Sequence, residues 1–198
     1  YMHLGDAITD EIILQLQHIK EFDRVLSRSS TMQFKNNRPT VPEIASKLGV
    51  NYIIEGSIQR QKENVIIRVQ VIRAKHENHV WGNEYHGKWE DIFYFQSDIA
   101  KKVADGLKIV LTQSEIEHIE KKPTENLEAY NQYLIGRSFI NLTIGGNVKK
   151  GIRYFENVIR LDSTFANAYV GLAQGYQSLV RYSWIPRDEG TKKAKEAI

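Results

Sequence analysis

The clearest pattern in the chain is a two-residue alternation of side-chain character between Asn51 and Tyr85. The apolar side chains at positions 65, 67, 69 and 71 share one face, while Arg68 and Gln70 take the other. Alternation with this period is typical of β-strands that bury one face. Polar turns at 61–64 and 74–78 separate three such segments. The sequence therefore predicts a three-stranded antiparallel meander over 51–60, 65–73 and 79–85.

Apolar positions with a helical period flank this meander on both sides. Asp6 is a candidate N-cap for a first amphipathic helix, and Asp91 is a candidate N-cap for a longer one. Between them we expect a short strand at 24–28, a polar loop at 31–42 and a short helix at 43–48 that ends at Gly49. The first helix has its apolar residues at Ile8, Ile12, Leu16 and Ile19, and the second at Ile92, Phe95, Ile99, Val103, Leu107 and Val110. The second helix should cover one face of the sheet.

The alternation also predicts a strand register and, with it, a group of charges. If Ile58 faces Ile67 and Val71 faces Trp81, then Arg68 lies opposite Glu84. Glu55 then becomes a diagonal neighbour of Arg68 on the same face. We expect Glu55, Arg68 and Glu84 to form a structural charge cluster. The alternative is a ligand or catalytic site, for which a deep pocket with a perturbed acid at this place would be the evidence.

From Asn126 onward the apolar period is helical throughout. Breaks at Gly145-Gly146 and Asp162-Ser163 separate three helices, and a fourth begins near Asp188. The polar segment 113–125, which contains Pro123, is expected to be a linker. The predicted domains are therefore 1–112, an α/β (α+β) domain with a small antiparallel sheet covered by helices, and 126–198, an all-α region.

Small and aromatic residues in the helical half follow a spacing that resembles tetratricopeptide repeats. They are Gly136 with Phe139, Gly151 with Phe155, and Tyr169-x-x-Leu172-Ala173-x-x-Tyr176, and the segment 160–169 resembles the joint between two repeats. Small residues let two helices approach closely while aromatic rings fill the seam. The resemblance covers one full repeat and one truncated repeat, with longer insertions than usual. It implies a protein or peptide partner, with Gln132, Asn141 and Tyr169 as candidate contact residues.

The first half resembles the TolB-like amino-terminal domain over residues 1–111. Gly5-Asp6-Ala7, Glu55-Gly56-Ser57, His79-Val80-Trp81 and Asp91-Ile92-Phe93 carry this resemblance. It implies a bacterial protein in which such a domain precedes tetratricopeptide repeats and often follows a nucleotide cyclase, a winged-helix DNA-binding domain or a kinase domain. The family usually opens with a strand before the Tyr1 region. The sequence opens almost directly with a predicted helix and ends at Ile198 inside another, so we expect a fragment of a longer protein. The resemblance implies a place on the periplasmic side of a membrane-anchored protein, with a cytoplasmic place as the alternative.

Composition narrows the chemistry further. The chain has no cysteine, which excludes disulfides, thiolate nucleophiles and cysteine zinc sites. The net charge of +3 comes from scattered lysines rather than a basic stripe, so no nucleic-acid partner is expected. His76, His79 and His86 lack a ligand spacing, so neither a metal nor a cofactor is expected. The leading hypothesis is a non-catalytic interaction or sensor module of a signalling protein. An enzyme with its site at the charge cluster and the accessory part of a DNA-binding regulator are the alternatives, and self-association stays open.

Overall fold

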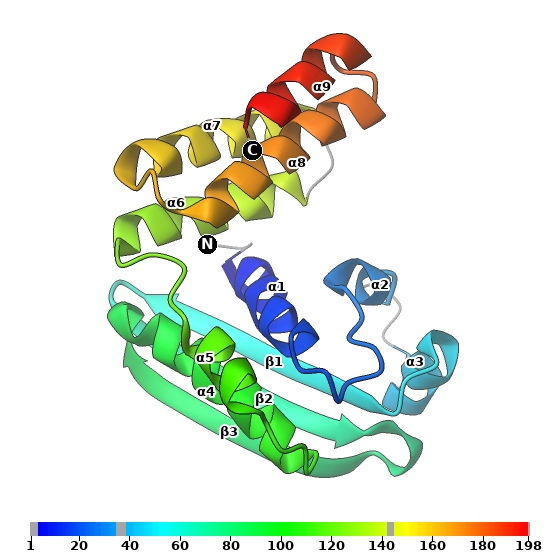
Figure 1. The fold of residues 1–198 in the computed structure, drawn as a ribbon. Helices are drawn as coiled ribbons and strands as arrows, with labels where there is room; N and C mark the ends of the chain where they lie inside the picture. Colours follow the sequence, from blue (N-terminus) through cyan, green and yellow to red (C-terminus); the bar gives the residue numbers. More distant parts are fainter. Residues whose placement is uncertain (1–3, 35–38, 142–144, 198) are drawn as a thin grey trace. The chain divides into compact units, whose positions relative to one another are not determined.

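The computed structural model describes residues 4–34, 39–141 and 145–197. The chain divides into two compact units. One, the α/β unit, spans Ile8–Lys121, and the other, the helical unit, spans Lys122–Ile198 with the first seven residues. A small antiparallel sheet with helices is thus followed by an all-helical part, as the sequence predicted (Figure 1). In the described part of the chain, no helix has both the length and the apolar character needed to cross a bilayer.

The sheet has three antiparallel strands in the order β1 (Tyr52–Gln61), β2 (Asn64–Arg73) and β3 (Asn78–Lys88). The predicted register is confirmed, because Ile58 pairs with Ile67 and Val71 pairs with both Ile54 and Trp81. A bulge after Val71 shifts the last pairs of β2 with β3. The face that holds the odd-numbered residues of β2 is buried, since Val65 and Val71 are at most 1% exposed.

Helix α4 (Ile92–Gly106) packs on this buried face against β2 and β3 (Figure 1). The predicted apolar stripe is buried from Ile92 to Val103. The prediction was wrong for the C-terminal part of the stripe, because the helix ends at Gly106 and Val110 is 86% exposed. The left-handed backbone of Lys108, with φ of 61°, turns the chain away from the helical path. Asp91 is the N-cap residue, but its carboxylate accepts from the Lys88 backbone N–H rather than from the helix.

Helix α1 (Leu4–Gln17) begins before Asp6, so Asp6 lies in its first turn and is not the N-cap that the sequence predicted. An acidic residue in the first turn still interacts favourably with the positive end of the helix dipole. Ala7, Ile8, Leu16 and Ile19 are all at most 2% exposed. Of the four predicted apolar positions, Ile8, Leu16 and Ile19 are therefore buried and Ile12 is half-buried, and Ile19 lies beyond the end of the helix.

The short strand expected at 24–28 is absent. Residues 24–27 are irregular, and Arg28–Met32 form the single turn of helix α2. Hydroxyl side chains favour this local turn, because Thr31 Oγ1 donates to the Arg28 carbonyl and Ser27 bonds to Ser29. None of the three strands in the described sheet pairs with this segment.

Helix α3 (Val41–Leu48) ends at Leu48, as the sequence predicts. Thr40 and Glu43 form a capping box, in which Glu43 Oε2 accepts from the Thr40 N–H at 2.8 Å. Gly49 follows with φ of 64°, the left-handed conformation that glycine adopts at low cost after a helix. The helix starts two residues earlier than expected, because Pro42 fits its first turn.

Helix α5 (Gln113–Glu120) occupies most of the segment that was predicted to be a linker. Thr112 and Glu115 form a capping box that starts the helix, and Ile119 is 1% exposed. The helix packs on α4 within the α/β unit. The linker prediction was wrong because it relied on the polar composition and on Pro123, whereas the capping-box pattern of Thr112 and Glu115 is a local signal for the start of a helix.

The helical unit contains α6 (Leu127–Ile140), α7 (Gly145–Leu161), α8 (Ala166–Arg181) and α9 (Arg187–Glu196). Gly145 and Gly146 begin α7 instead of separating two helices, since the described part of α6 ends earlier, at Ile140. Consecutive helices pack against each other, and α6 also contacts α8. The fourth helix starts at Arg187, within one residue of the predicted position.

Glycines bring these helices close around one aromatic ring. Phe155 of α7 is fully buried and lies between Gly136 of α6 and Gly171 of α8. A Cβ atom on Gly171 would lie 2.6 Å from Phe155 Cζ, and one on Gly136 would lie 2.9 Å from Phe155 Cε1. Neither position has room for a side chain unless the ring moves. Tyr133 and Phe165 extend the cluster, with ring centres 4.9 Å apart.

Candidate functional site

The polar face of the sheet brings together two of the three residues of the predicted charge cluster. Arg68 of β2 lies opposite Glu84 of β3, and its Nε donates to Glu84 Oε2 at 2.5 Å while Nη2 donates to Oε1 at 3.2 Å. His86 Nε2 lies 2.6 Å from Glu84 Oε1. The hydrogen bond and charge of Arg68, with a smaller contribution from His86, hold the pKa of Glu84 below its ordinary value.

Glu55 of β1 has a different partner. Its Oε2 accepts from Gln70 Nε2 at 3.0 Å, across the β1–β2 pair. The Arg68 and Glu84 side chains are 46% and 39% exposed, so the group is a row of cross-strand bonds on an open surface. Solvent screens charges in such a place. Arg68 and Glu84 are therefore more exposed than side chains in the deep pocket that the catalytic alternative requires.

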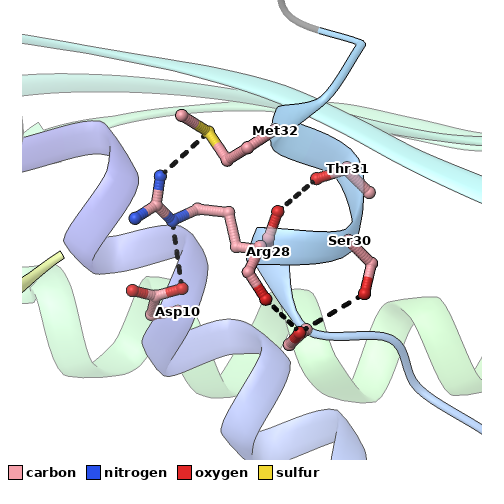
Figure 2. A network of polar contacts seen from close by, with 7 residues as sticks. Asp10, Arg28, Ser30, Thr31 and Met32 are labelled. Carbon is pink, nitrogen blue, oxygen red and sulfur yellow. Dashed lines mark hydrogen bonds and ion pairs between the residues drawn. The ribbon is translucent and has the colours of Figure 1, made fainter. Parts of the chain in front are cut away.

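An ion pair joins α1 to α2 within the α/β unit (Figure 2). Arg28 Nε donates to Asp10 Oδ1 at 3.1 Å, and both side chains are 13% exposed. Figure 2 also shows the Arg28 guanidinium against Met32, whose Sδ accepts from Nη1 at 3.2 Å. These contacts fix the position of the short α2 turn beside α1, which is a structural role.

Helix α5 is held to α1 and the residues just after it by two hydrogen bonds and one contact between rings. Glu115 Oε1 accepts from the Lys20 backbone N–H at 2.9 Å, and Gln15 Nε2 donates to the Ile119 carbonyl at 3.3 Å. The rings of His18 and His118 lie 3.7 Å apart. Partial burial, followed by the nearby His118, lowers the pKa of His18.

The pKa of Glu115 is lowered from 4.5 to about 2, first by the Lys20 N–H and then by the N–H and hydroxyl of Thr112. Since the folded pKa lies below the unfolded one, this contribution to stability is complete above about pH 4.5 and disappears as the pH falls towards 2. In Glu115→Gln, the difference in unfolding free energy from the wild type should therefore shrink across this interval. Chemical denaturation at a series of pH values measures it.

Glu117→Gln is the matched control for that experiment, because Glu117 is exposed on the same helix and, among the described residues, its carboxylate accepts from Gln113 of that helix. Its difference from the wild type should stay nearly constant between pH 4.5 and pH 2. A difference for Glu115→Gln that is equally flat would show that the carboxylate does not hold α5 in place.

The helical unit does not gather Gln132, Asn141 and Tyr169 on one surface. Gln132 and Asn141 are nine residues apart on α6, which places them on opposite sides of a helix with about 3.6 residues per turn. Gln132 Nε2 donates to Glu128 Oε1 at 2.8 Å, and the Tyr169 hydroxyl donates to the Ser163 carbonyl at 2.9 Å. Asn141 is exposed at the C-terminal end of α6.

The joint between α7 and α8 is fixed by hydroxyl groups around one carboxylate. Asp162 accepts from Thr124 Oγ1 at 2.5 Å and from the Thr164 N–H at 2.9 Å. These bonds, with that of Thr124 first, lower the pKa of Asp162. Asn126 accepts from the N–H groups of Glu128 and Ala129 and caps α6 beside this joint. The polar side chains here position helices.

Among the residues that the structure describes, no three His, Asp or Glu side chains gather in a way that could hold a metal ion. What the sequence interpretation missed is a hollow in the α/β unit, lined among others by Tyr52, Arg73 and Lys75. A signal for it was present. Arg73 and Tyr52 are in phase with the buried face of their strands, and they pair with each other across the sheet. A cation at such a position marks the place where the core ends.

Comparison with known proteins adds one relative. The chain is similar to part of a bacterial protein named "Putative adenylate cyclase 3". That protein is from Rhizobium meliloti (strain 1021), and the two are 28% identical over 171 residues, which are 86% of this chain. The chain spans 29% of the length of that relative. No protein-family model matches the chain.

Proposed function

We propose that this chain is a non-catalytic interaction module of a bacterial signalling protein, and that its helical unit binds a protein or peptide partner. In this proposal α6–α7 and α8–α9 are hairpins of the tetratricopeptide type, and the α/β unit is of the TolB-like type. The name of the similar bacterial protein supports the link to signalling. Because the chain spans 29% of that protein, the cyclase activity in the name is proposed to belong to a part of the longer protein outside this chain.

The observation that carries the proposal is the glycine-lined seam between the helices. Gly136, Gly171 and Phe155 let α6, α7 and α8 pack closely, with hardly any side chain between the backbone and the ring. Gly175 repeats the arrangement, since a Cβ there would lie 2.6 Å from Ile152. Close packing of consecutive antiparallel helices through small residues is how helical repeats build an extended binding surface.

Helix α8 offers a continuous exposed stripe for such a partner. Its members recur every three or four residues and therefore lie on one side of the helix. They are Ala166, Val170, Gln174, Gln177 and Arg181. Val170 is 46% exposed, so the stripe combines an apolar side chain with amides and a cation. Asn141 stays a candidate contact, whereas Gln132 and Tyr169 use polar atoms inside the helical unit.

A site-specific cross-link tests the proposal. A photoreactive phenylalanine analogue placed at Gln174, in the full-length protein expressed in its bacterium, should give a discrete cross-linked product on illumination. The same analogue at Lys149, which is exposed on α7, is the control and should give none. A product of twice the mass would identify a second copy as the partner. The same products at both positions, or none at either, would contradict a partner on the α8 stripe.

A further inference from the structure

A hollow of about 670 Å³ lies in the α/β unit where α3 meets the sheet. Its wall is formed by α3, by the start of β1 and by the segment after β2. The Ala74 backbone N–H donates to the Asn51 carbonyl at 3.0 Å and fixes two of these segments to each other. Sites for small molecules have volumes of about 300–1,000 Å³, so this hollow has the size for a small ligand.

The charge that lines the hollow is entirely positive. Arg73 and Lys75 are both exposed, and none of the described residues that line the hollow has a carboxylate. Within the described residues neither cation makes an ion pair, and the Arg73 guanidinium lies against the Tyr52 ring. Two cations without acidic partners at one hollow give it a positive potential that attracts an anion.

The negative end of α3 does not cancel this potential. Its last carbonyls, those of Leu48 and Gly49, accept from Arg24 Nη2 at 2.8 Å and 3.1 Å. A guanidinium that caps these carbonyls offsets the partial negative charge of the helix end. An anion in the hollow would therefore meet cations without facing uncapped carbonyls of this helix end.

The remaining lining suits a flat apolar group. Tyr52 is 37% exposed, and the Arg73 guanidinium carbon lies 5.8 Å from the centre of its ring. Ala45, which is 5% exposed, and Pro42 add apolar wall on the α3 side. The flat ring of a ligand could stack on the tyrosine ring. A negative group on the edge of the same ligand would then lie beside the guanidinium.

We propose that this hollow binds a small organic anion that carries a flat ring. Arg73 and Lys75 bind the negative group, and the Tyr52 ring stacks on the flat part. Ser46 and Asn51 at the rim supply a hydroxyl and an amide for further hydrogen bonds. This site lies on the α/β unit and does not depend on the partner proposed for the helical unit.

Nuclear magnetic resonance of the whole ¹⁵N-labelled chain tests the site with four probes. Benzoate and adenosine monophosphate each combine a ring with a negative charge, one as a carboxylate and one as a phosphate. Inorganic phosphate lacks the ring, and benzyl alcohol lacks the charge. We expect saturable shifts at the amides of Ser46, Asn51 and Lys75 with at least one of the first two probes. Phosphate and benzyl alcohol should bind at least tenfold more weakly.

Variants connect the binding to the residues. Arg73→Gln with Lys75→Gln should weaken binding at least tenfold, because each replacement removes a charge-assisted contact. If the double variant changes the whole spectrum, and therefore the fold, the affinity of Lys75→Gln alone is the test. Lys62→Gln, which replaces an exposed lysine in the β1–β2 turn, should leave binding unchanged. Absence of shifts with both ring-bearing anions, equal binding of all four probes, or unchanged affinity in Lys75→Gln and the double variant would overturn the proposal.

Discussion

Replacement of Phe155 by alanine is expected to lower the stability of the helical unit by about 3–5 kcal/mol. The ring is fully buried, with its centre 5.9 Å from that of Tyr133, and it lies against Gly136 and Gly171. Because glycines have no side chains that could move into the space, the cavity left by the ring should stay open. The cost should therefore lie in the upper part of the range for large-to-small changes.

Hydrogen exchange with mass spectrometry measures this effect for each unit separately. Peptides from α7 in Phe155→Ala should exchange faster, by an amount that reports the lost free energy of opening. Leu161→Ala is the matched control, since Leu161 is on the same helix but 45% exposed, and it should cost less than about 1 kcal/mol. Equal acceleration in the two variants would show that the Phe155 ring does not hold the three helices together.

Replacement of Phe95 by alanine is the corresponding experiment for the α/β unit, with an expected loss of about 3–5 kcal/mol. Phe95 is 5% exposed on α4, and its ring centre lies 5.5 Å from that of Tyr85 on β3. Gly87 makes room for the ring, because a Cβ there would lie 2.6 Å from Phe95 Cζ. The ring therefore fills the space between α4 and the edge of the sheet.

Tyr94→Ala is the control, because the preceding residue is also aromatic but is 62% exposed. We expect a change of about 0.5 kcal/mol or less. Urea unfolding followed by tryptophan fluorescence measures both variants in a Trp184→Phe background, where the two remaining tryptophans, Trp81 and Trp89, both report on the α/β unit. A large loss in Tyr94→Ala, or a small one in Phe95→Ala, would contradict the packing of α4 on the sheet.

The candidate sites differed in how well they could be predicted. The pair of Arg68 with Glu84 follows from the register, and the structure has it. The partner of Glu55 does not follow, because a diagonal neighbour and a directly opposite Gln70 compete for one carboxylate, and the opposite residue is closer. The resemblance to tetratricopeptide repeats suggested Gln132 and Asn141 as contact residues. Their spacing of nine residues places them on opposite sides of α6.

By itself, the sequence determined the features that depend on neighbours in the chain. The meander, its register and the left-handed Gly49 after α3 all follow from residues a few positions apart or from a strict two-residue period. The order of a small sheet followed by helices was predictable for the same reason, since each period extends over many residues.

The tertiary structure decided everything that depends on contacts between distant segments. Residues 24–28 do not form a strand, because strand formation requires a partner that local pattern does not supply. Residues 113–120 have a local capping box, but the place of helix α5 in the fold depends on Lys20 and Gln15, about a hundred positions earlier, which bond to it. The hollow at Arg73 likewise exists only where α3, β1 and the end of β2 meet. Such contacts depend on how the chain packs, and the spacing of residues along it does not encode them locally.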